Sequence, residues 1–166
     1  MALGGLAVYP YYVREKAMGM KKSLTLKTGT ALIFCGAILS LIVNYVLAVT
    51  GFTESSESYQ QVAETQFALP LWLAILFYGI LTPIVEEQVF RGIACNWLER
   101  NVSPVMGVVG AALLFGVFHG NLVQMLYASI MGLFLGYVNL RCRTLLAPVL
   151  VHSAANVAIY LITYFF

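Results

Sequence analysis

Uncharged apolar stretches of membrane-spanning length are the feature that most constrains how this chain can fold. An α-helix needs about 20 apolar residues to cross a bilayer. Only 10% of the 166 residues are charged, against roughly 25% in soluble domains. The sequence therefore predicts an all-α fold, a multi-spanning transmembrane helical bundle of about five spans. The predicted spans are residues 28–50, 68–85, 104–118, 122–140 and 144–166.

The charged residues are divided unequally between the two sides of the predicted membrane. Of the nine Lys and Arg residues, five lie in 1–27, two in 91–103 and two in 141–143, whereas the loop 51–66 has three Glu and no basic residue. Because basic residues are enriched in cytoplasmic loops, we expect the N-terminus in the cytoplasm and the C-terminus outside. Residues 1–27 are predicted to form a juxtamembrane segment that contacts lipid head groups. No nucleic-acid-binding module accompanies it, so nucleic acid is not an expected partner.

Two adjacent glutamates, Glu86 and Glu87, directly follow the second apolar stretch, and Arg91 comes one helical turn later. Charged residues in or beside a membrane span are costly and are therefore usually paired or functional. Glu87 and Arg91 have the spacing and order that favour an ion pair on one helix, although snorkelling to the membrane interface explains this pair equally well. Glu86 has no such local partner, which makes it the stronger candidate for a general base.

The helix that carries the glutamates is expected to be long and bent. Pro83, three residues before Glu86, has no backbone N–H, so it frees a carbonyl group and is expected to kink the helix. We expect the helix to continue past Gly92 to about Arg100. Only then do Glu86 and His119 lie at similar depths, about 21 and 22 Å from the inner end at ~1.5 Å per residue.

The two histidines, His119 and His152, also lie in or beside apolar stretches, and Asn156 follows His152 by one helical turn. Each of these residues alone is well explained as a hydrogen-bonded packing residue. A helical bundle can, however, gather them with Glu86 at one point. A carboxylate and a histidine can deprotonate a water molecule, while a second histidine and an amide can stabilise an oxyanion, and together these steps hydrolyse an amide.

A metal ion is the alternative use of the same residues. Glu86, His119 and His152 could bind a divalent metal such as zinc and leave one position for water. We favour no metal and no other cofactor, because a glutamate can activate water by itself. The HExxH motif of thermolysin-type metalloproteases is absent.

Several other hydrolytic mechanisms are excluded by residues that the sequence lacks. The chain has no Asp, which excludes an aspartyl intramembrane protease, and it has no GxSxG motif. Ser153 adjoins His152, but neighbours on a helix point in different directions. The three cysteines are widely spaced and are interpreted as packing residues.

Three motifs, taken in order, resemble those of a known protease family. They are Glu86-Glu87-x-x-Phe90-Arg91-Gly92, Phe115-x-x-x-His119 and His152-x-x-x-Asn156. The family is the CAAX protease and bacteriocin-processing (CPBP, or Abi) family, which includes the type II CAAX prenyl endopeptidase. The resemblance covers roughly residues 68–160 and implies an all-helical membrane endopeptidase, with 28–166 as a CPBP-like protease core.

The resemblance also implies a role for each motif residue. It implies that Glu86 and His119 activate the attacking water, and that His152 and Asn156 stabilise the oxyanion. Glu87 and Arg91 match positions that support the site. Peptide or bacteriocin processing in a prokaryotic cell membrane, self-immunity and CAAX-type processing are the expected contexts, by analogy. The alternatives are a non-catalytic immunity or interaction protein that keeps the fold, a zinc-dependent protease, and, least favoured, a channel or proton-coupled transporter.

Overall fold

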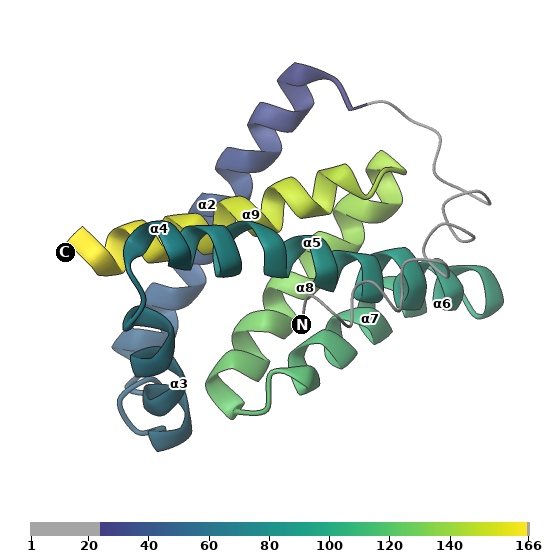
Figure 1. Ribbon diagram of the computed structural model, residues 1–166. Coiled ribbons are helices and arrows are strands. Elements are labelled where there is room, and N and C mark those ends of the chain that lie inside the picture. Colours follow the sequence, from purple (N-terminus) through teal and green to yellow (C-terminus); the bar gives the residue numbers. More distant parts are fainter. Residues whose placement is uncertain (1–23, 166) are drawn as a thin grey trace.

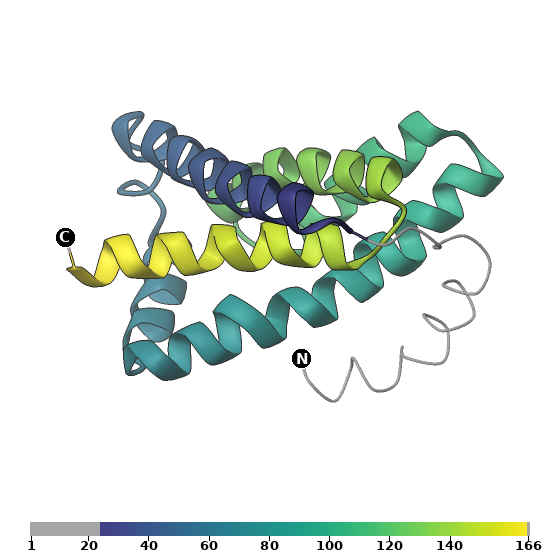
Figure 2. The same ribbon diagram turned by 90° about the horizontal axis from the view of Figure 1, so that it is seen from above.

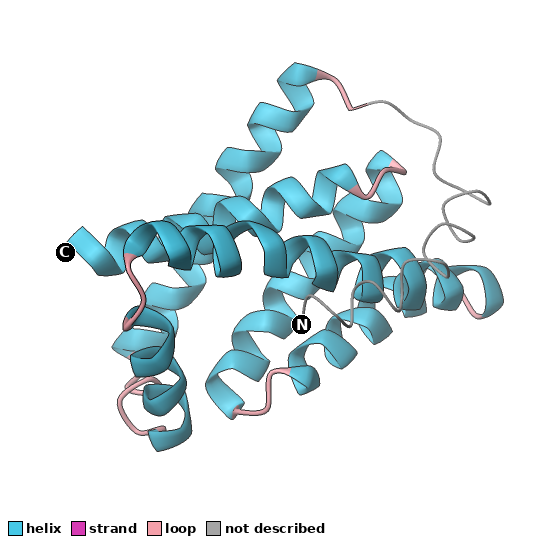
Figure 3. Ribbon diagram, in the orientation of Figure 1, coloured by secondary structure: helices cyan, strands magenta, loops and turns pink. Residues whose placement is uncertain are grey.

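Helices make up the bundle formed by residues 24–165, the part of the chain that the computed structural model describes (Figure 1). No strand occurs within these residues (Figure 3), which confirms the predicted all-α class. The helices are α2 (Leu26–Val49), α3 (Glu57–Phe67), α4 (Leu71–Ala74), η1 (Ile75–Leu81), α5 (Thr82–Glu87), η2 (Gln88–Cys95), α6 (Asn96–Asn101), α7 (Pro104–Phe118), α8 (Leu122–Cys142) and α9 (Leu146–Phe165).

Four helices of the described chain are long and apolar enough to cross a membrane. They are α2, the continuous helix Leu71–Asn101, α8 and α9, while α7 is apolar but has only 15 residues. This is roughly consistent with the predicted number of about five spans. Each of the five predicted apolar stretches forms a helix over most of its length. A segment that buries its backbone in lipid must satisfy its hydrogen bonds internally, and a helix does so.

The segments α4 to α6 form one continuous helix of 31 residues, Leu71–Asn101. The predicted extension past Gly92 is therefore confirmed. Two of its segments, η1 and η2, are π-helices, in which each N–H bonds the carbonyl five residues earlier. Pro83 lies at the second position of α5, directly after η1. The wider turns of η1 and η2 flank α5, the segment that carries the two glutamates.

The segment between the first two spans is not a simple polar loop, as its composition had predicted. It contains α3, which begins after Ser56, whose hydroxyl accepts a hydrogen bond from the N–H of Tyr59. One face of α3 is half-buried and mostly apolar, and the other carries exposed polar residues. The half-buried face consists of Tyr59, Val62, Ala63, Gln66 and Phe67, which recur at helical spacing.

A tight turn, His119-Gly120-Asn121, joins α7 to α8. His119 ends α7, and Gly120 has a φ of +78°, a conformation that favours glycine. The side chain of Asn121 then caps α8 by accepting a hydrogen bond from the N–H of Gln124. This turn holds α7 against α8 and fixes the end of α7, where His119 is located.

Glycines let the helices approach closely in two places. A Cβ atom at Gly36 on α2 would lie 2.6 Å from the backbone oxygen of Val151 on α9. On α8, Cβ atoms at Gly132 and Gly136 would lie 3.0 Å from Ala112 Cα and 3.2 Å from Val108 Cα of α7. These two α8 glycines therefore serve packing, since small residues allow close contact between helices in lipid. Figure 2 shows α2 and α9 side by side.

We expect Gly36→Ala to lower the free energy of unfolding by about 1–3 kcal/mol, because the added methyl group meets backbone that cannot move aside. Thermal unfolding of the purified protein in detergent measures this change. Gly29→Ala is the matched control, since a Cβ at Gly29 would lie at an ordinary 3.4 Å from the nearest atom, Leu24 Cδ2. Equal melting temperatures for Gly36→Ala and the parent protein would contradict the expectation.

An ion pair joins two of the segments that the charge distribution predicted on the cytoplasmic side. Arg143, directly after α8, donates to both carboxylate oxygens of Glu99 on α6, at 2.9 and 2.6 Å. The segments 91–103 and 141–143 therefore meet at one end of the bundle. The predicted juxtamembrane segment 1–27 lies mostly outside the described residues.

Candidate active site

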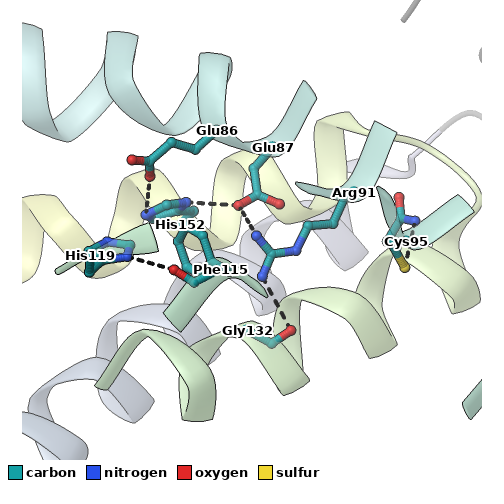
Figure 4. A network of polar contacts seen from close by, with 9 residues as sticks. Glu86, Glu87, Arg91, Cys95, Phe115, His119, Gly132 and His152 are labelled. Carbon is teal, nitrogen blue, oxygen red and sulfur yellow. Dashed lines mark hydrogen bonds and ion pairs between the residues drawn. The ribbon is translucent and has the colours of Figure 1, made fainter. Parts of the chain in front are cut away.

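Glu86 and Glu87 are buried at the end of α5, inside the bundle rather than at its edge (Figure 4). Their side chains are 6% and 0% exposed. This burial excludes the snorkelling explanation for both glutamates, because a snorkelling side chain keeps its charged group in water. Two carboxyl groups in such a position need hydrogen-bond or charge partners, which the same long helix and α9 supply.

Arg91 supplies the first partner. Its Nη1 donates to Glu87 Oε1 at 2.9 Å, and both side chains are fully buried. The predicted pairing of Glu87 with Arg91 is thus present in the structure. Nη2 of Arg91 donates to the carbonyl of Gly132 on α8 at 3.2 Å. A Cβ at Gly132 would lie 3.3 Å from this Nη2 atom, so the glycine also makes room for the guanidinium.

His152 of α9 lies between the two glutamates. Its Nδ1 is 2.9 Å from Glu87 Oε1, and its Nε2 is 3.7 Å from Glu86 Oε2. A carboxylate can only accept a hydrogen bond, so Nδ1 carries the hydrogen and donates it to Glu87. The contact with Glu87 therefore fixes the ring orientation and directs Nε2 toward Glu86, a device that also orients catalytic histidines elsewhere.

His119 is held in an equivalent way from the end of α7. Its Nδ1 is 2.8 Å from the carbonyl oxygen of Phe115, one turn earlier on the same helix. The carbonyl accepts, so this Nδ1 also carries the hydrogen, and Nε2 is left as the unprotonated nitrogen of the neutral ring. Both histidines thus use Nδ1 for anchoring and keep Nε2 available.

The ring of Phe115 occupies the space among these groups. It lies edge-on to His119 and His152, with ring centroids 4.8 and 5.5 Å away. On the other side, the Cζ atom of Arg91 is 4.5 Å from the ring centroid, a cation–π contact. Phe115 is 2% exposed. The ring therefore lies between the guanidinium of Arg91 and the two histidines and packs against all three side chains.

Asn156 lies one turn after His152 on α9 and contacts the long helix. Its Nδ2 donates to the backbone carbonyl of Tyr78 at 2.8 Å. This bond fixes the orientation of the amide and uses one of its two hydrogens. The second hydrogen and the Oδ1 atom take no part in this bond.

A cavity of about 340 Å³ connects these side chains. Glu86, His119, His152 and Asn156, the four residues that the sequence proposed as catalytic, all line it. The structure thus brings three separate sequence motifs to one space, which is also of the size of ligand-binding pockets. The half-buried face of α3 covers part of this cavity, and aromatic side chains form much of its remaining wall. The aromatic lining residues are Tyr59, Phe67, Tyr78, Phe115, Phe118, Tyr127 and Tyr160.

The side chains do not form a ready-made metal site. Within residues 24–165, no group of three or more His, Cys, Asp or Glu side chains lies close enough together to hold a metal ion. The set Glu86, His119 and His152 has suitable donor atoms, but it is not arranged as a metal-binding group. No step of the chemistry below is therefore assigned to a metal.

Sequence reasoning missed two features of this site. It explained Glu87 by Arg91 alone, whereas Glu87 also anchors His152 from another helix. No local spacing signals a contact between residues 65 positions apart. It also missed α3 as a wall of the cavity. The signal was present in the helical spacing of Tyr59, Val62 and Gln66, and in the capping Ser56.

Comparisons with known proteins point to one family of membrane peptidases. A family model described as type II CAAX prenyl endopeptidase Rce1-like matches residues 68–158, the region that carries all three motifs. A Bacillus subtilis (strain 168) protein named "Putative membrane peptidase YdiL" is 27% identical over 108 residues. These residues cover 65% of this chain and 43% of the relative, so the chain spans less than half the relative's length. No solved structure matches the chain.

Proposed function

We propose that this chain, which belongs to the type II CAAX prenyl endopeptidase Rce1-like family, is an intramembrane endopeptidase that hydrolyses peptide bonds with a glutamate-activated water. The observation that carries the proposal is the position of Glu86. Its buried carboxylate faces His152 Nε2 in a cavity that His119 and Asn156 also line. A carboxylate with a histidine in a cavity can accept a proton from water and later return it.

The chemistry begins with a water molecule held by Glu86 and the Nε2 atom of His119. Glu86 accepts one proton as the water oxygen attacks the carbonyl carbon of the scissile peptide bond. This forms a tetrahedral intermediate with a negatively charged oxygen. The proton then passes to the peptide nitrogen as the C–N bond breaks, which releases a carboxylic acid and an amine and restores the Glu86 carboxylate.

The oxyanion is stabilised by donors from α9. The second N–H of Asn156 supplies one hydrogen bond, and His152 supplies another when its Nε2 is protonated. Glu87 lies 2.9 Å from Nδ1 of His152 and holds the ring in place. Arg91 in turn balances the charge of Glu87. Glu87 and Arg91 therefore act through His152 rather than on the substrate.

A membrane position follows from the same proposal. We place the protein in a prokaryotic cell membrane with the N-terminus in the cytoplasm, which the basic residues at 91–103 and 141–143 support. The substrate is then a peptide or a membrane-associated protein segment that reaches a cavity with many aromatic side chains. Peptide or bacteriocin processing and CAAX-type processing are both compatible with such a cavity.

Peptide digestion in ¹⁸O-labelled water tests the proposal. The purified protein, reconstituted in lipid vesicles, is incubated with a mixture of synthetic peptides, and the products are identified by mass spectrometry. We expect new C-termini that carry one ¹⁸O atom from the attacking water, and we expect none from the His152→Ala protein. If the folded parent protein cleaves nothing, the peptidase proposal is wrong. If His152→Ala cleaves at the parent rate, the assigned chemistry is wrong.

A further inference from the structure

The hydrogen bond that fixes Asn156 depends on a backbone carbonyl that a normal helix would not leave free. In η1 the N–H groups donate five residues back, and the last such bond runs from the Thr82 N–H to the Phe77 carbonyl. The next bond with the same five-residue spacing would run from the backbone N–H of residue 83 to the carbonyl of Tyr78. Residue 83 is a proline and has no N–H to donate.

The Tyr78 carbonyl is the group that accepts from Asn156, at 2.8 Å. A buried carbonyl without a hydrogen-bond partner costs free energy. Because Pro83 has no N–H to donate, a donor from another helix is favoured at this carbonyl. The sequence predicted a free carbonyl near Pro83, and the structure identifies its partner as a residue of the active-site cavity.

Pro83 itself is fully buried and is not among the residues that line the cavity. It lies three residues before Glu86 in α5. We propose that Pro83 is a positioning residue: its missing N–H reserves the Tyr78 carbonyl for Asn156 and so aims the asparagine amide at the reaction centre. This inference rests on the proposed peptidase function for its kinetic consequence, but the hydrogen bond itself can be tested separately.

Pro83→Ala is the direct test, because alanine at this position has an N–H that competes with Asn156 for the Tyr78 carbonyl. We expect kcat for the peptide cleaved by the parent protein to fall about 10- to 100-fold, the effect of a catalytic group displaced by roughly 1 Å. KM should change little, because the cavity wall is unaltered. In the Asn156→Ala background, Pro83→Ala should lower kcat no further.

NMR of the side-chain amide supplies a readout that does not depend on activity. With ¹⁵N-labelled asparagine, the Asn156 signal is assigned by its absence from the Asn156→Ala protein. We expect its Nδ2 protons to shift upfield in Pro83→Ala as the bond to the carbonyl weakens. A shift without any peptidase activity in the parent protein would support the hydrogen-bond role and contradict only the proposed function.

Pro148→Ala is the matched control. Pro148 is also a fully buried proline, but it lies in the first turn of α9, where the helix needs no N–H. This variant should leave kcat and the Asn156 signal unchanged. Should Pro83→Ala fail to fold, Pro83→Gly restores the same N–H with the smallest side chain. An unchanged Asn156 signal in either folded variant, or additive losses of kcat with Asn156→Ala, would overturn the proposal.

Discussion

Replacing Glu86 with glutamine is expected to reduce peptide hydrolysis by about 10²- to 10⁴-fold, the usual contribution of a general base. The amide keeps the shape of the side chain but cannot accept the proton of the attacking water. The measurement is the initial rate on the peptide that the parent protein cleaves fastest. Melting temperature in detergent shows in parallel whether the variant is folded.

Glu57→Gln is the control for this prediction. It makes the same chemical change in an exposed carboxylate at the start of α3. We expect it to retain the parent rate. A Glu86→Gln protein with more than about a tenth of the parent rate would remove Glu86 from the mechanism, since even a weak general base contributes more than that.

Arg91→Ala is expected to destabilise the protein by about 3–5 kcal/mol, because it leaves the charge of Glu87 buried without its partner. Arg91 and Glu87 are both 0% exposed. The variant also loses the contact with the Phe115 ring and the bond to the Gly132 carbonyl. Thermal or denaturant unfolding in detergent measures the change.

A second arginine in an ion pair provides the comparison. Arg143 approaches Glu99 more closely, at 2.6 Å, but its side chain is 45% exposed. Because exposed pairs contribute roughly 0–1 kcal/mol, Arg143→Ala should shift the unfolding transition only slightly. The double variant Glu87→Gln/Arg91→Met, which removes both charges, should recover much of the stability lost in Arg91→Ala. Equal losses of unfolding free energy in Arg91→Ala and Arg143→Ala would show that burial does not determine the cost of breaking an ion pair.

The sequence predicted the helices well because lipid leaves the backbone few alternatives. Apolar length and the rule that membrane segments satisfy their own hydrogen bonds sufficed for α2, α7, α8 and α9. The extension of the second helix beyond Gly92 followed from a depth argument. The local pair Glu87 and Arg91 followed from helical spacing. All of these inferences use information within one turn or one stretch of the chain.

The contacts between helices could not be predicted in the same way. The sequence paired Glu86 with His119, and nothing in it indicated that His152 Nε2 would lie 3.7 Å from Glu86 or that His119 would be anchored on its own helix. Which histidine faces which glutamate depends on the rotation of α7 and α9 about their axes. That rotation is set by close glycine contacts such as Gly36 against Val151. The order of the motifs indicates which residues to propose for the site. It does not indicate which of these residues contact each other.

Helix α3 is the wall of the cavity that is least buried in the bundle. None of residues Glu57–Phe67 is fully buried, and the helix is held from α9 by the ring of Tyr160, 5.0 Å from that of Phe67. We therefore expect α3 to undock in a local opening, at a lower free energy than is needed to separate α2 from α9 or α7 from α8. Undocking of this one short amphipathic helix would widen access to the buried glutamates, while the membrane bundle beneath it stays intact.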